Sequence, residues 1–272
     1  MQDKTSADAR YSNGRMKMYD KELLSEEFYI DDDGIKLHMK LDRPAGQGSL
    51  PLAVVVHGFT GHMEEPHITG ISRALNGRGI ATLRAELYGH GKSGGRFEDH
   101  TIYKWMSELM TVINYAASLE FATKLFLVGH SQGGLCTVLT GGLMADRLDA
   151  IVPLSPAMSI AEDASTGHIL DAEFDPYNIP DKVIFPDGKV LGGNYFRAAQ
   201  FLPVEEAIKR FRGPVLVVHG DGDESVPVSC GIELAKKYKN ASLAIIKGDT
   251  HCYDNKLEEV EKAVADFLEA LA

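Results

Sequence analysis

The segment LFLVGHSQGGL, residues 125–135, places a serine between glycines at the end of an apolar run. Its first four residues have the continuous hydrophobicity of a strand buried on both faces of a parallel sheet. Gly129, Ser131 and Gly133 form a G-x-S-x-G motif, and the pattern that follows predicts a helix over 135–144. Between a strand and a helix, this motif holds the serine in a strained conformation with its hydroxyl exposed. Ser131 is therefore a candidate nucleophile, and the alternative is a structural serine in a glycine-rich turn.

Similar apolar runs recur along the chain, with helical patterns between them, at 52–58, 79–87, 150–155, 215–220 and 242–248. Apolar residues repeat every three or four positions over 101–119 and near the C-terminus, as in amphipathic helices packed on a sheet. Asp33 and Gly34 separate two β-prone runs and predict a hairpin turn. This alternation predicts an α/β fold with a mostly parallel central sheet, helices on both faces and an antiparallel hairpin at its start.

The length of 272 residues, 44% of them hydrophobic, fits one large domain. Residues 1–25 are polar and aperiodic, and we interpret them as an N-terminal extension to a domain over 26–272. The stretch from about 156 to 208 breaks the strand–helix rhythm and is too long for an ordinary connection. Because it contains aromatic and aliphatic residues that can bury surface, we expect it to form a small inserted lid over one end of the sheet.

The composition excludes several classes of protein. A formal charge of −11 and a pI near 5.4 argue against nucleic-acid or anionic-membrane partners. No segment has the run of roughly 18 apolar residues that a membrane span needs, and the N-terminus lacks an apolar signal region. The three cysteines lack the spacing of a disulfide framework or a zinc site. We expect a cytoplasmic protein with reduced thiols.

A serine nucleophile needs a base that is oriented by a carboxylate, and this fold supplies them in the chain order serine, acid, histidine. After the apolar run 215–220 come Asp221, Asp223 and Glu224. His251 follows the next run and is the only histidine C-terminal to that acidic turn. We prefer Asp223 as the acid, because Asp221 lies so close to the strand end that it is suited to shaping the turn.

An oxyanion hole is the third requirement of this chemistry. The loop HGFTG, residues 57–61, follows the early apolar run in the position of a hole-forming loop. We expect the backbone N–H groups of Phe59 and Gln132 to be the donors, with His57 and His130 bracing the loops.

Two other motifs are weaker. Gly89 to Ser93 ends like a phosphate-binding loop, but Glu86 stands where that motif requires its first glycine. His62 and His67 lack the spacing of a helical metal site, and Pro66 would interrupt a shared helical face. We predict no metal and no cofactor.

The chain resembles the α/β-hydrolase superfamily from about Phe28 onward, and within it the bacterial cinnamoyl (feruloyl) esterases. The likeness rests on VVVHGFTGHMEEPHI, LYGHGKSGG, LVGHSQGG, FDPYNIPD, LGGNYFRAAQFLPV, HGDGDESVP and GDTHCY. The resemblance implies a lid that grips a phenolic ring, with Asp163 and Tyr195 as polar residues that bind the ring hydroxyls. A third polar lid position corresponds to Leu170, which puts the preferred ring pattern in doubt.

These observations predict a serine carboxylesterase that hydrolyses small hydroxycinnamic esters through an acyl-enzyme, using Ser131, Asp223 and His251 without a cofactor. A general short-chain acyl esterase or monoacylglycerol lipase with the same residues is the nearest alternative. A non-catalytic ligand receptor on the same scaffold is the alternative from another class, because one fold hosts many functions.

Overall fold

The computed structural model describes residues 22–46 and 48–272. The N-terminal extension predicted over 1–25 falls largely on residues 1–21, which lie outside the described residues. The first strand begins at Leu23, earlier than the domain start predicted at 26. Its first five residues, Leu23 to Glu27, are all exposed, so no alternation of buried and exposed side chains marks the start of the strand. Backbone pairing with the next strand, from Leu23 opposite Pro44 onward, places them in the sheet.

The described chain forms an eight-stranded sheet in the order β1-β2-β4-β3-β5-β6-β11-β12. The strands are β1 (Leu23–Asp32), β2 (Ile35–Pro44), β3 (Leu50–Val56), β4 (Ala81–Ala85), β5 (Ala122–His130), β6 (Ala150–Leu154), β11 (Val215–Gly220) and β12 (Ala241–Ile246). Neighbours from β4 to β12 pair in parallel, whereas β1 pairs antiparallel with β2, and β2 with β4. The predicted fold class is therefore confirmed.

The β1–β2 hairpin turns at Asp33 and Gly34, as the sequence predicts. Their φ angles are 52° and 82°, so both residues occupy the left-handed region that a two-residue hairpin of the mirror-image type requires. Asp31 also accepts a hydrogen bond from the Gly34 N–H at 3.0 Å, which closes the turn from the side.

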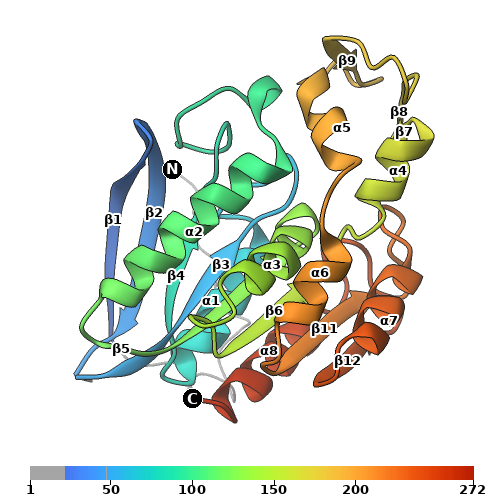
Figure 1. Ribbon diagram of the computed structural model, residues 1–272. Coiled ribbons are helices and arrows are strands. Elements are labelled where there is room, and N and C mark those ends of the chain that lie inside the picture. Colours follow the sequence, from blue (N-terminus) through green and yellow to red (C-terminus); the bar gives the residue numbers. More distant parts are fainter. Residues whose placement is uncertain (1–21, 47) are drawn as a thin grey trace, which may run out of the picture.

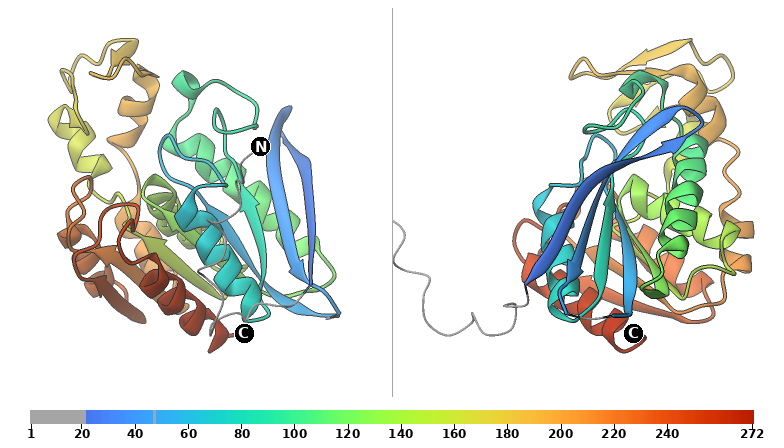
Figure 2. Two further views of the ribbon diagram at one scale, coloured as in Figure 1. Left: turned by 180° about the vertical axis from the view of Figure 1, so that it is seen from behind. Right: turned by 90° about the vertical axis from the view of Figure 1, so that its left-hand side faces the viewer.

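Helices cover both faces of the sheet, and each face has its own hydrophobic core. One face carries α1 (Pro66–Gly77) and α8 (Leu257–Glu269), which pack against each other and lie in front of the sheet in the left view of Figure 2. The opposite face carries α2 (Ile102–Ser118), α3 (Gln132–Leu143), α6 (Val204–Arg210) and α7 (Val228–Lys237). Figure 1 shows this second face toward the viewer.

Between β6 and β11 the chain leaves the sheet and forms a small separate layer above one end of it (Figure 1). We call residues 156–203 the inserted segment. It contains α4 (Ile160–Thr166), β7 (His168–Ile169), β8 (Ala172–Glu173), β9 (Lys182–Ile184), β10 (Val190–Gly192) and α5 (Gly193–Ala199). The predicted boundary at 208 falls inside α6, which packs against α3 at the sheet.

The described helices include none that is both long and apolar enough to cross a lipid bilayer. The cytoplasmic location stays a prediction.

Candidate active site

Ser131 stands alone between β5, which ends at His130, and α3, which begins at Gln132. Its φ of 54° and ψ of −118° are strained for a residue with a side chain. The Ser131 N–H donates a hydrogen bond to Leu154 O at 2.9 Å, which ties the turn to strand β6. The helix predicted from 135 begins earlier, because the strand joins the helix through this one strained residue without a loop.

The two glycines of the motif are required by close backbone packing. A Cβ atom on Gly129 would collide with Gly133 O and Thr137 Oγ1, and one on Gly133 would collide with His57 O. The strand, the helix and the loop after β3 therefore meet at distances that only glycine permits.

We expect Gly133→Ala to displace His57 and its loop from α3, because the obstructing atom belongs to the backbone. Overpacking of this kind costs about 1 to 3 kcal/mol, so the melting temperature should fall by roughly 2 to 10 °C. A thermal melt measures the effect. Gly48→Ala is a useful contrast, because no atom of the described residues lies within 4 Å of that Cβ position. An unchanged melting temperature in Gly133→Ala would contradict the packing described here.

Asp223 and His251 come from the turns after β11 and β12, and they meet at the C-terminal edge of the sheet. His251 Nδ1 donates a hydrogen bond to Asp223 Oδ2 at 2.7 Å. The Asp223 carboxylate is fully buried and the His251 side chain is 13% exposed. Since Nδ1 carries the proton, the other ring nitrogen of a neutral His251 is free to act as a base. Among the described residues, no hydrogen bond joins Ser131 Oγ to His251, a contact that is often loose before substrate binds.

Three further groups hold the Asp223 carboxylate. Its Oδ1 accepts from the N–H groups of Ser225 and Val226 at 2.9 and 2.8 Å, and His219 Nε2 lies 3.1 Å from Oδ2. Burial alone would raise the pKa of Asp223, but the hydrogen bonds from His219, His251 and Val226 outweigh it and hold the pKa well below its usual range. The carboxylate is therefore ionised at neutral pH. His219 was not identified from the sequence as a partner of Asp223. The available signal was a histidine within an otherwise apolar strand.

The other two acids of this turn do not pair with His251. Asp221 is exposed and accepts a hydrogen bond from the Gly248 N–H, which links the turns after β11 and β12. Glu224 is exposed and lines the pocket, and within the described part of the chain no hydrogen bond or ion pair joins it to His251. The geometry thus brings Asp223, and neither neighbour, against His251.

Phe59 and Gln132 line the same pocket as Ser131 and His251. Gln132 is the first residue of α3, so its N–H has no acceptor within the helix and lies at the positive end of the helix dipole. The backbone N–H groups of Phe59 and Gln132 donate no hydrogen bond to any described residue. Both are available to a ligand.

Buried histidines brace the loops around these donors, as the sequence predicts. His57 Nδ1 donates to Gly58 O at 2.8 Å, and its Nε2 accepts from the Leu87 N–H at 3.2 Å. Burial lowers the pKa of His57 to about 3, so the ring stays neutral. His130 Nε2 donates to His251 O at 2.8 Å and joins the serine turn to the histidine loop.

The glycine-rich stretch from Gly89 to Ser93 encloses a side chain of the protein itself. The Lys92 N–H donates to Glu86 Oε2 at 2.6 Å, and Ser93 Oγ donates to Glu86 O at 2.7 Å. A carboxylate of the protein therefore binds a loop N–H group that a phosphate-binding loop would offer to its ligand.

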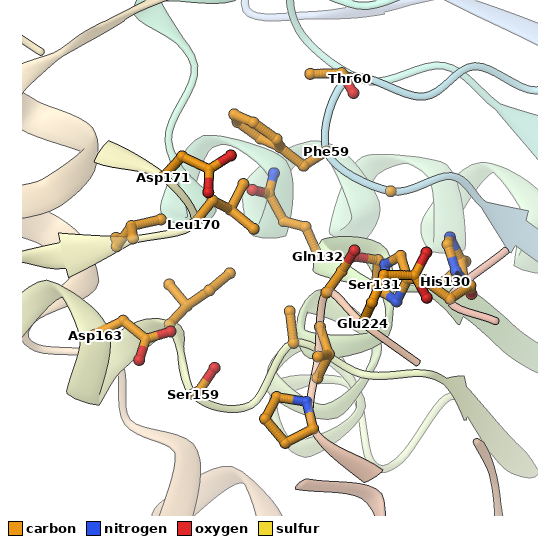
Figure 3. Close-up of a pocket in the computed structure, with 18 of the residues that line it drawn as sticks. Phe59, Thr60, His130, Ser131, Gln132, Ser159, Asp163, Leu170, Asp171 and Glu224 are labelled. Atoms are coloured by element: carbon orange, nitrogen blue, oxygen red, sulfur yellow. Dashed lines mark hydrogen bonds between the residues drawn. The ribbon is translucent and has the colours of Figure 1, made fainter. Parts of the chain in front are cut away.

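The pocket has a volume of about 660 Å³ and lies between the sheet edge and the inserted segment. Asp163 and Tyr195, predicted to contact substrate, both line it, and so does Leu170. Figure 3 shows Asp163 and Ser159 across the pocket from Ser131. Burial raises the pKa of Asp163, partly offset by the Ser159 side chain. Asp171 also lines the pocket and was missed from the sequence, although it adjoins Leu170.

Similar proteins have been found by sequence and by structure. A family model described as serine aminopeptidase, S33, matches residues 50–175. The structure of ferulic acid bound to Est1E from Butyrivibrio proteoclasticus is 50% identical, with a TM-score of 0.87, over 89% of this chain and 97% of that one. A second Est1E structure is 45% identical, with a TM-score of 0.85, over 90% and 99%. Human monoglyceride lipase is 26% identical over 86% of each chain.

A strained serine between a central parallel strand and a helix, in one pocket with a histidine that a buried aspartate binds, is typical of serine hydrolases. The chain belongs to the α/β-hydrolase superfamily and is related to the bacterial feruloyl esterases.

Proposed function

We propose that this protein is a serine carboxylesterase that hydrolyses esters of hydroxycinnamic acids. The single observation that supports this most is the buried Asp223–His251 hydrogen bond facing the same pocket as the strained Ser131. The 50% identity to a structure that holds ferulic acid favours an aromatic acyl group.

The proposed reaction begins when Ser131 Oγ attacks the ester carbonyl and its proton passes to the neutral ring of His251. Asp223 orients that ring and stabilises the imidazolium that forms. The N–H groups of Phe59 and Gln132 donate to the oxyanion of the tetrahedral intermediate. The intermediate collapses to an acyl-enzyme, and the alcohol leaves with the proton from His251. Water, deprotonated by His251, then attacks the acyl group and releases the acid and Ser131.

The polarity of the pocket wall supports an aromatic acyl group over a long alkyl chain. Four carboxylates line the cavity: Glu65, Asp163, Asp171 and Glu224. A long alkyl chain would desolvate them and return no hydrogen bond, which is costly. A phenolic ring buries apolar area and offers a hydroxyl that can donate to a carboxylate. The inserted segment would then act as a lid that holds the ring. Tyr195 donates its proton to Gln132, so it can only accept from a ring hydroxyl.

A general acyl esterase or monoacylglycerol lipase is the second candidate, and the similarity to human monoglyceride lipase favours it. Comparing kcat/KM for methyl ferulate, caffeate and p-coumarate with kcat/KM for aryl butyrates and a monoacylglycerol distinguishes the two. We expect the hydroxycinnamates to be the better substrates. A clear preference for monoacylglycerol would reject the proposal in favour of the second candidate, and no turnover of any ester would favour a receptor.

Asp163→Asn tests ring recognition. A hydrogen bond to an ionised acceptor is about twice as strong as a neutral one, so kcat/KM for caffeate or ferulate esters should fall by roughly 3- to 30-fold. An aryl butyrate has no acyl-side hydroxyl and should change little. Glu162→Gln, an exposed neighbour on α4, is the matched control. Equal losses on both substrates would assign Asp163 a structural role.

A further inference from the structure

The Tyr195 side chain reaches from the inserted segment to the residue after the nucleophile. Its ring is 2% exposed, and its hydroxyl donates a hydrogen bond to Gln132 Oε1 at 2.8 Å. Gln132 is fully buried and supplies one of the two backbone N–H groups that face the pocket. In this arrangement the carboxamide oxygen binds Tyr195, and the NH₂ group forms the other end of the Gln132 carboxamide.

The Gln132 side chain also lies near His100. Gln132 Nε2 and His100 Nε2 are both buried, and neither has a hydrogen-bond partner among the described residues. His100 Nδ1 donates to Phe97 O at 2.6 Å, so the Nε2 of the neutral ring carries a lone pair. Burial lowers the pKa of His100 to about 4, and the interaction with the Gln132 side chain opposes that shift. The Gln132 side chain therefore lies close to the buried His100 ring.

Tyr195 and His100 also pack near Phe59, which supplies the second N–H donor. The ring of Phe59 lies 5.7 Å from that of His100 and 6.3 Å from that of Tyr195, measured between centroids. The rings of His100 and Tyr195 are 5.2 Å apart in an edge-on arrangement. Figure 3 shows Phe59 and Gln132 lining the pocket together with Ser131. Tyr195 and His100 therefore pack against both residues whose N–H groups face the pocket.

We propose that Tyr195 and His100 are positioning residues that hold the Gln132 and Phe59 N–H groups in the direction of the oxyanion. The inserted segment then has a role in the chemical step besides binding the acyl group. This inference rests on the proposed function, because it assumes that these N–H groups stabilise a tetrahedral intermediate.

The role predicts a loss that does not depend on the acyl group. Removing an oxyanion donor costs about 10²- to 10³-fold in kcat, and a misdirected donor should lose a part of that. Every ester passes through the same oxyanion, whatever its acid. A residue that only contacts the phenolic ring would instead affect hydroxycinnamates alone.

The test measures kcat and KM of Tyr195→Phe, Gln132→Met and the double variant with methyl ferulate and 4-nitrophenyl butyrate. Methionine keeps the Gln132 backbone N–H and removes the carboxamide. We expect each single variant to lower kcat by about 5- to 50-fold on both substrates, with KM within about threefold. The Tyr195 hydroxyl and the Gln132 carboxamide share one interaction. The kcat of the double variant should therefore be no lower than that of the more impaired single variant. Tyr177→Phe, a lid tyrosine that is 97% exposed, is the control and should match the wild type.

An aryl trifluoromethyl ketone, which forms a tetrahedral adduct with a reactive serine, gives a second readout. Its inhibition constant should rise in Tyr195→Phe by about the factor by which kcat falls. A lowered melting temperature with wild-type kcat, additive losses in the double variant, or a loss confined to methyl ferulate would overturn the inference alone. If the wild type hydrolysed neither ester, the proposed function would fail and the inference with it.

Discussion

Ser131→Ala should lower kcat for ester hydrolysis by about 10⁴- to 10⁶-fold, leaving only what binding and the oxyanion hole supply. The reason is geometric: Ser131 is the only residue of the β5–α3 turn, and its strained φ presents the side chain to the pocket. Alanine keeps the backbone and removes the nucleophilic oxygen, so the fold should survive. Steady-state kinetics with methyl ferulate measure the loss, and a thermal melt confirms that the variant is folded.

Labelling locates the nucleophile independently of the substrate. An organophosphonate should modify Ser131 in the wild type and leave Ser131→Ala unmodified. Ser165→Ala, an exposed serine on α4, should label and turn over like the wild type. If the Ser131→Ala variant kept more than about a tenth of wild-type kcat, the proposed mechanism would be wrong.

Asp223→Asn should have the second largest effect, a loss of about 10³- to 10⁴-fold in kcat. An asparagine amide placed against His251 would favour the tautomer with the proton on Nε2, where the base must accept one. The same substitution removes the negative charge that stabilises the imidazolium. It also leaves the buried His219 Nε2 beside a weaker acceptor. The loss in kcat should be present at every pH near neutrality, because the wild-type Asp223 carboxylate is ionised throughout that range.

The neighbouring acids provide matched controls for that substitution. Asp221→Asn should cost less than about threefold in kcat, because its hydrogen bond to the Gly248 N–H links two turns and does not reach His251. Glu224→Gln should behave similarly. A larger loss in Asp221→Asn than in Asp223→Asn would assign the acid to Asp221 and contradict the Asp223–His251 pairing described here.

The central sheet and the serine turn were predictable because each depends on local pattern. Continuous apolar runs mark strands that are buried on both faces, and an Asp-Gly pair between β-prone runs marks a hairpin. The G-x-S-x-G motif, with one histidine after one acidic turn, was sufficient to pick Ser131, Asp223 and His251 as a candidate set. The start of β1 was missed because its exposed residues are held by backbone pairing, which side-chain pattern does not record.

The residues that support the candidate set could not be predicted, because their roles arise from contacts distant in sequence. His219 reaches Asp223 from the end of β11, and Tyr195 reaches Gln132 across 63 positions. His100 stands in a polar loop and gives no local signal of its contact with Gln132. The resemblance assigned Tyr195 to substrate binding alone, whereas its hydroxyl proton is donated within the protein. Only the packed structure shows that the inserted segment contacts the residue after the nucleophile.

The central claim is that a hydroxycinnamoyl group is carried on Ser131 during turnover. A 4-nitrophenyl ester of ferulic acid tests it most directly, because its good leaving group makes deacylation the slow step. Rapid mixing followed by acid quench and peptide mass mapping should show a burst of 4-nitrophenolate matched by one feruloyl group per protein, on the peptide that contains Ser131. Full turnover with Ser131 never carrying a feruloyl group, or with the group on another residue, would contradict the account.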